Sequence, residues 1–192
     1  MHAVDIAFLM DSSDNIDVEN FEKQKSLVIS IVRSFGISPN TSRAAVVLYS
    51  DKASVRFRFG DSMSTKLFEN TVRDLPHIRG ESRMDKAFEV AANDIFPSGR
   101  VGIPKIAFVV ANGQQASDAN LLDVASKTLT KAGVNVVALG VGTEIDSQEL
   151  RSVVKENDHV LQADSYDQLL LEKRNISQKI CKMAGKSLKC FP

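Results

Sequence analysis

The stretch "VDIAFLMDSSDNID", Val4–Asp17, contains the strongest indication of the fold. An apolar run ends abruptly at Asp11, and two serines, an aspartate and an asparagine follow. A continuous apolar run of this kind is typical of a strand in a parallel sheet that is covered on both faces. Because ligands bind at the carboxyl ends of the strands in such sheets, the oxygen-bearing side chains at this tip predict a binding site.

Further apolar runs predict more strands of the same kind. They are Ala44–Tyr49, Ile106–Val110, Val134–Val141 and the shorter, weaker His159–Gln162. Each is nearly continuous in Val, Ile, Leu, Ala and Phe, or short and bounded by polar residues. Strands of this composition are buried on both faces.

The segment "SVRFRF", Ser54–Phe59, alternates polar and apolar residues and predicts a half-exposed strand. It follows Ala44–Tyr49 after a turn near Asp51 that is too short for a crossover helix, so the two strands are predicted to pair antiparallel. Arg56 and Arg58 would then point outward from an edge of the sheet. They either discourage pairing between sheet edges or form a basic ligand-binding patch.

Stretches with apolar residues at helical spacing lie between the strands. They cover Val18–Phe35, Met84–Ile95, Leu121–Ala132, Asp146–Val154 and Ser165–Met183. Gly36 and Gly133 follow two of them as C-terminal caps. The alternation predicts an α/β fold: a doubly wound, Rossmann-like, mostly parallel six-stranded sheet with one antiparallel edge strand and helices on both faces.

The composition excludes several classes of function. The 192 residues include 24 Lys+Arg and 24 Asp+Glu, a formal net charge of zero, which predicts neither a nucleic-acid partner nor an anionic membrane surface. No apolar stretch is long enough for membrane insertion. The sequence has no dinucleotide-binding glycine motif, no Walker loop and no Gly-x-Ser-x-Gly elbow. The histidines, His2, His77 and His159, suit structural or solvent-facing roles, so the chain is not predicted to be an enzyme.

The cysteines and the glycosylation motifs bear on the cellular compartment. Cys181 and Cys190 are too few for a disulfide scaffold. They are either unrelated thiols, or they form a tail disulfide or bonds to other chains in an oxidising compartment. Asn40 and Asn175 each begin an Asn-x-Ser sequence that accepts N-glycans, which favours secretion.

Polar side chains from three places converge if the strand order reverses beside the first strand. Asp11, Ser13 and Asn15 follow that strand, and Asn112 follows the strand that ends in "VVANG". The loop "RGESRMD" leads into the next helix close by and adds Ser82.

These motifs resemble the von Willebrand factor type A family over essentially the whole chain. The family's metal-ion-dependent adhesion site has Asp-x-Ser-x-Ser after the first strand, a Thr in a later loop and an Asp in a "(T)DG" turn. Here "DSSDN", "GESRM" and "ANG" stand at those places. "GIPKIAFVV" and "LYSDKASVRFRF" are most similar to the collagen type VI and matrilin branch. The resemblance implies one such domain over residues 1–184, with 185–192 as a tail or linker.

The resemblance also implies a set of metal ligands. They are Asp11, Ser13, Asn15, Ser82 and Asn112. Asn15 replaces a serine of the family pattern, and Asn112 replaces an aspartate. Mg²⁺ favours carboxylate, hydroxyl and water oxygens, and this set supplies one carboxylate where the family has two. The site is therefore predicted to be degenerate, with weak or vestigial binding of Mg²⁺ or Mn²⁺.

Two neighbouring residues leave alternatives open. Asp14 is a replacement carboxylate if it swings into the site, although its position normally faces the rim. Arg83 either reaches Asp11 and takes the place of the cation, or is a solvated loop residue.

The resemblance implies a function without catalysis. The expected role is a secreted extracellular matrix module for adhesion or assembly, which binds collagen or other matrix proteins mainly through metal-independent surfaces, beside neighbouring domains of a multidomain parent. The alternatives are a metal-dependent adhesion domain that takes a partner carboxylate, and an intracellular scaffold.

Overall fold

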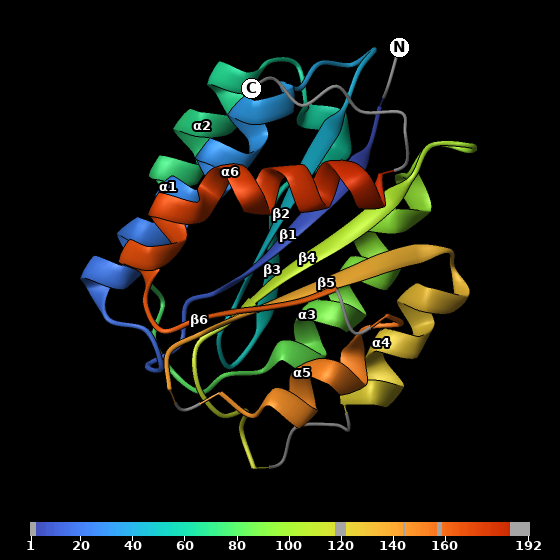
Figure 1. Ribbon diagram of the computed structural model, residues 1–192. Helices are drawn as coiled ribbons and strands as arrows, with labels where there is room; N and C mark the ends of the chain where they lie inside the picture. Colours follow the sequence, from blue (N-terminus) through green and yellow to red (C-terminus); the bar gives the residue numbers. More distant parts are fainter. Residues whose placement is uncertain (1–2, 118–121, 144, 157–158, 185–192) are drawn as a thin grey trace.

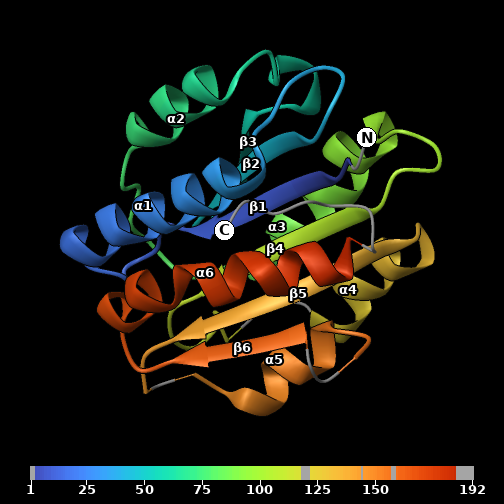
Figure 2. The same ribbon diagram turned by 45° about the horizontal axis from the view of Figure 1, so that its top comes forward.

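A single mixed sheet forms the centre of the computed structural model, which describes residues 3–117, 122–143, 145–156 and 159–184 (Figures 1 and 2). The strands are β1 (Asp5–Asp11), β2 (Arg43–Tyr49), β3 (Ala53–Phe57), β4 (Lys105–Ala111), β5 (Val134–Val141) and β6 (Val160–Ala163). Their order is β3-β2-β1-β4-β5-β6, and every pair is parallel except β2 with β3. The predicted six-stranded, doubly wound sheet with one antiparallel edge is therefore confirmed.

Helices cover both faces of the sheet (Figures 1 and 2). One face carries α1 (Val18–Phe35), α2 (Thr65–Arg73) and α6 (Tyr166–Met183); the other carries α3 (Met84–Val90), α4 (Leu122–Lys131) and α5 (Ser147–Val153). Alternate residues of β1 face the two cores, with Phe8 in the first and Leu9 in the second. None of the described helices is both long and apolar enough to cross a membrane.

Side-chain caps set the starts of three helices that begin at the carboxyl edge of the sheet. Asp17, Asp146 and Ser165 accept hydrogen bonds from the first-turn N–H groups of α1, α5 and α6. Gly36, with φ of +65°, ends α1. These boundaries agree with the sequence predictions. Helix α2 was not predicted, because it buries only Phe68 and Val72 and its apolar face is too short to stand out.

The edge strand β3 is half-exposed, as its alternation predicts. Its register against β2 shifts between Val46 and Val47. Arg56 is exposed on the strand, whereas Arg58 lies beyond its end and donates to the backbone oxygen of Asp94 at 2.9 Å. A short strand with an irregular register and an exposed arginine resists pairing with another edge.

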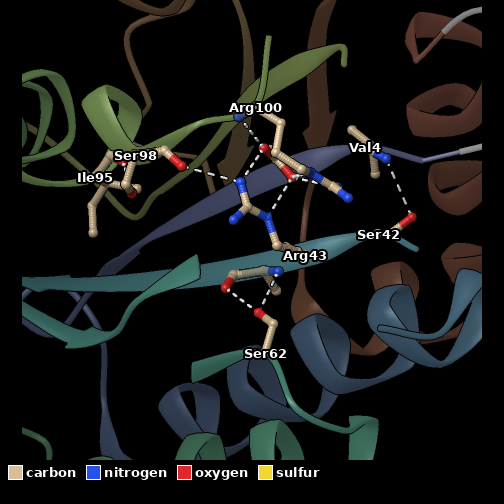
Figure 3. Close-up of polar contacts among 9 residues, drawn as sticks. Val4, Ser42, Arg43, Ser62, Ile95, Ser98 and Arg100 are labelled. Carbon is tan, nitrogen blue, oxygen red and sulfur yellow. Dashed lines mark hydrogen bonds and ion pairs between the residues drawn. The ribbon is translucent and has the colours of Figure 1, made fainter. Parts of the chain in front are cut away.

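An ion cluster that the sequence did not indicate closes the amino edge of the sheet (Figure 3). Asp5 is fully buried, and its carboxylate accepts N–H groups from Arg43 at 2.7 and 3.1 Å and from Arg100 at 2.6, 2.8 and 3.0 Å. Burial alone would raise the pKa of Asp5, but the hydrogen bonds from these arginines outweigh it and hold the pKa below its usual value. Arg43 also donates to Ser98, so the cluster ties β1 and β2 to the segment before β4.

The predicted tail, 185–192, lies outside the described residues, and Cys190 lies within it. Cys181 is buried in the last turns of α6. The pairing of the two cysteines stays a prediction.

Candidate functional site

From the sequence, the site residues are expected to converge if the strand order reverses beside the first strand, and the structure meets this condition. Strands β1 and β4 are neighbours, with Met10 paired to Val110, so Asp11 and Asn112 emerge at the same carboxyl edge. The strand order reverses between these two strands, which is where doubly wound sheets bind ligands.

Asp11 lies at the centre of the site and is fully buried. Its carboxylate accepts the Ser13 backbone N–H at 2.8 Å and the Ser82 hydroxyl at 3.3 Å. Burial raises the pKa of Asp11 to about 6, although these hydrogen bonds act in the opposite direction. No cationic side chain of the described residues is among the groups that shift its pKa. The donors to the buried Asp11 carboxylate among the described residues are thus neutral groups.

Ser82 is joined to a glutamine from the β4–α4 loop. Its hydroxyl accepts Nε2–H of Gln115 at 3.1 Å, and Oε1 of Gln115 accepts the backbone N–H of Met84 at 2.8 Å. Gln115 therefore ties the loop after β4 to the start of α3.

Asn15 also bridges two loops. It is exposed, and its Nδ2 donates to the backbone oxygen of Gln114 at 2.8 Å. It packs on Gly113, whose φ is +104° and where a Cβ atom would lie 3.1 Å from the Asn15 amide carbon. Glycine is needed at this position for both reasons.

Asn112 is 5% exposed and contacts α6. Its Oδ1 accepts the hydroxyl of Tyr166 at 2.6 Å. Its Nδ2 is buried and has no hydrogen-bond partner among the described residues. Burial raises the pKa of Tyr166 well above its usual value, so the phenol stays protonated and acts as the donor.

Asp14 and Arg83 both have partners outside the centre of the site. The Asp14 carboxylate accepts the Gly80 N–H at 3.1 Å and lies 3.3 Å from the Arg79 guanidinium, at the rim. Arg83 is 15% exposed and donates two hydrogen bonds to the buried carboxylate of Asp85, at 2.9 and 2.8 Å. Arg83 is therefore paired with Asp85, and it fits neither of the two alternatives, a partner of Asp11 in place of the cation or a solvated loop residue.

A hollow of about 230 Å³ opens beside Asn112 and Tyr166. Residues of the loops after β1, β4, β5 and β6 line it, and most of their polar groups are amides or hydroxyls: Asn15, Asn20, Asn112, Thr143, Ser165 and Tyr166. Asp164 is the acidic side chain in the lining.

The sequence analysis missed the residues that support the site from behind. Gln24 is fully buried on α1 and donates to the backbone oxygen of Asp11 at 3.0 Å. Tyr49 lies buried beneath the site, with its hydroxyl 2.6 Å from the backbone oxygen of Val110. The sequence does contain one signal for Gln24. It is a polar residue that lies between Phe21 and Val28 on the core-facing side of a predicted helix.

The comparison of sequences decides the family. The profile of the von Willebrand factor type A domain matches residues 5–174. The chain belongs to this family. It is 27% identical to the mouse (Mus musculus) collagen alpha-6(VI) chain over 98% of its own length and 8% of that protein. It is 26% identical to matrilin-1 of Gallus gallus over 93% of its length and 36% of that protein. The predicted extracellular location is confirmed by these relatives, which are secreted matrix proteins.

Solved structures show the same fold. Proximal thread matrix protein 1 (PTMP1) from the mussel byssus is 26% identical, with a TM-score of 0.86 over 100% of this chain and 48% of that one. A second structure of PTMP1, described as having a zinc-occupied MIDAS motif, is 27% identical with a TM-score of 0.87 over 94% of this chain and 46% of that one. This type A domain therefore spans less than half of these relatives.

Proposed function

We propose that this type A domain is a non-enzymatic module for adhesion or assembly in the extracellular matrix, and that it binds collagen or another matrix protein mainly without a metal ion. The relatives support the first part, since collagen VI, collagen XXI and matrilin-1 are structural matrix proteins. The geometry at the carboxyl edge supports the second part.

The observation that carries the proposal is the set of hydrogen bonds between the site loops. Asn15, Ser82 and Asn112 occupy the positions where the family pattern differs. They bond, respectively, to Gln114, to Gln115 and to Tyr166. Each bond joins two separate segments of the chain. The loops are thus held in place by the protein's own side chains, which is the structural role that a bound cation would otherwise have.

The donor set fits a divalent cation incompletely. Asp11, Ser13 and Ser82 lie together and offer one carboxylate and two hydroxyls. The oxygen of Asn112 is already hydrogen-bonded to Tyr166, and the described residues contain no group of three or more His, Cys, Asp or Glu side chains that could hold a metal ion. Mg²⁺ needs an octahedron of oxygen ligands and usually binds through one or two carboxylates.

A metal-dependent adhesion site is the second candidate, and one observation favours it. Asp11 is a buried carboxylate without a cationic partner among the described residues, and its pKa of about 6 reflects that burial. A bound cation would supply the missing charge. The zinc-occupied MIDAS motif of PTMP1 supports this candidate for the family.

Binding with and without a chelator separates the two candidates. The domain would be passed over immobilised collagen VI, fibrillar collagen and matrilin in EDTA, and again in Mg²⁺ or Mn²⁺. We expect binding to at least one of these proteins, with an affinity in EDTA within about twofold of the affinity in Mg²⁺. A twofold change corresponds to less than about 0.5 kcal/mol, which is much smaller than the change that the loss of a bond between a bound metal ion and the partner would cause. Binding that disappears in EDTA and returns with Mg²⁺ would establish the second candidate. Failure to bind any matrix protein would contradict both.

Glycosylation tests the extracellular assignment separately. Asn40 lies exposed in the turn before β2, and Asn175 lies exposed on α6. We expect the domain secreted from animal cells to lose mass on treatment with an N-glycosidase, and Asn40→Gln and Asn175→Gln each to remove one glycan. A secreted wild-type domain without either glycan would show that these motifs are not used.

A further inference from the structure

A buried chain of polar groups runs beneath the site and connects four elements of the fold. Gln24 on α1 donates through Nε2 to the backbone oxygen of Asp11 at the end of β1. The Gln24 side chain also lowers the pKa of Tyr166, the first residue of α6, against the larger effect of burial, so its amide acts on the Tyr166 hydroxyl. Tyr166 in turn donates to Oδ1 of Asn112, after β4, at 2.6 Å. We call these three side chains, Gln24, Tyr166 and Asn112, the relay.

The direction of the hydrogen bonds in the relay follows from its first member. A backbone oxygen only accepts, so the Asp11 carbonyl requires the NH₂ group of Gln24 to face it. That NH₂ group is also the part of Gln24 that can donate to the Tyr166 oxygen. The phenol hydrogen is then left for Asn112, which must present its oxygen.

The orientation of Asn112 therefore commits its oxygen to Tyr166 and leaves its N–H groups as the part of the side chain without a partner among the described residues. Its oxygen faces Tyr166, and its Nδ2 is buried without a partner among the described residues. An amide NH₂ group presents hydrogens of positive partial charge, and its nitrogen lone pair is delocalised into the carbonyl group, so it is not a ligand for a hard cation. The family pattern has an aspartate here, which offers only oxygens in any orientation.

We infer that Tyr166, supported by Gln24, sets the polarity of this site: it turns the Asn112 amide so that the site rejects divalent cations. This inference rests on the proposed metal-independent function. It assigns the rejection of divalent cations to one hydroxyl group, that of Tyr166. Tyr166 is thus a positioning residue, which acts on the cation through Asn112. Without its hydroxyl, the amide is free to rotate and to place its oxygen beside Asp11.

Binding of Mn²⁺, followed by the loss of the free-ion electron paramagnetic resonance signal, tests the inference. The control is Tyr49→Phe, since Tyr49 is also fully buried near Asp11 but donates to a backbone oxygen. At about 1 mM Mn²⁺, the affinity range of extracellular cation sites, we expect no binding by the wild type or Tyr49→Phe. We expect Tyr166→Phe to bind Mn²⁺ at this concentration, a gain in affinity of at least about tenfold, which is the equivalent of one hydrogen bond.

Gln24→Met provides a second variant if Tyr166→Phe folds poorly. Without the Gln24 donor, the Tyr166 hydroxyl can accept from Asn112, so the amide can turn and cation binding should again increase. In the wild type we also expect one Asn112 amide proton pair that exchanges slowly with solvent by NMR, and faster exchange in Tyr166→Phe.

The outcomes separate the inference from the proposed function. If neither relay variant binds more Mn²⁺ than Tyr49→Phe, the relay does not control the cation and the inference is overturned, while chelator-resistant binding of matrix proteins would still support the proposed function. If the wild type binds Mn²⁺ at this concentration, the relay does not exclude cations and the inference is again overturned. Gain of binding in both relay variants, with none in Tyr49→Phe, is the supporting result.

Discussion

Asp5→Asn is expected to lower the free energy of unfolding by about 3 kcal/mol near neutral pH, because it leaves Arg43 and Arg100 beside a group without charge. The value is at the lower end of the range for broken buried pairs, since the arginine side chains keep 15% and 25% of their exposure. For a domain of this size, the melting temperature should fall by about 6–12 °C, as measured by circular dichroism.

Asp94→Asn is the matched control for this variant. Asp94 is an exposed aspartate near the same edge of the sheet, and we expect its replacement to change stability by less than about 0.5 kcal/mol. Arg43→Met and Arg100→Met should each cost less than Asp5→Asn, because one arginine remains paired. Equal stability of Asp5→Asn and Asp94→Asn would show that the cluster contributes nothing net.

The pH dependence of the Asp5 effect has a definite sign. Its pKa is lower in the folded state than in the unfolded chain, where it is near 3.8. The stabilisation is therefore fully present above about pH 4 and is lost as the pH falls through the folded-state pKa. The defect of Asp5→Asn should shrink in acid.

Asp11→Asn is expected to have the opposite effect and to stabilise the domain near neutral pH. The pKa of Asp11 rises from 3.8 to about 6 on folding, chiefly through burial, so the ionised side chain costs about 3 kcal/mol above pH 6. An amide removes that cost but weakens one hydrogen bond, worth about 1 kcal/mol. The net gain is about 2 kcal/mol, measured by urea denaturation in EDTA.

The gain from Asp11→Asn should depend on pH. Between pH 6 and 3.8 the wild-type carboxyl takes up a proton in the folded state, so the cost disappears and the two proteins approach each other in stability. Asp14→Asn, at the exposed rim, is the control. An Asp11→Asn domain that is less stable than the wild type at neutral pH in EDTA would mean that the hydrogen bonds to Asp11 outweigh its burial.

These two aspartates lie at the two ends of β1, and their sequence neighbours do not show which of them has cationic partners. Each begins or ends the same buried strand. Asp5 meets arginines at positions 43 and 100, whereas Asp11 meets a serine at position 82 and neutral donors nearby. Only the packing of distant segments decided which of the two carboxylates has its charge balanced by arginines.

Local patterns predicted most of the fold. The apolar runs of β1, β2, β4 and β5 and the alternation of β3 fix buried and half-exposed strands because side chains alternate between faces along a strand. The helical spacing of apolar residues predicts α1 and α6, and Asp17 and Ser165 cap their starts because their side chains satisfy N–H groups within the next turn. These interactions span a few residues, so the sequence alone specifies them. Helix α2 was not predicted because its apolar face contains too few residues.

The sequence also determined where a site would lie and which residues would meet there. It placed Asp11, Ser13 and Ser82 together from the strand order of a doubly wound sheet. What the tertiary structure alone decided is how the polar atoms are paired: Arg83 with Asp85, Ser82 with Gln115, and Asn112 with Tyr166. Except for the first, these partners lie more than 30 positions apart. The orientation of an amide depends on which donors and acceptors surround it in three dimensions, and no periodicity in the sequence encodes that arrangement.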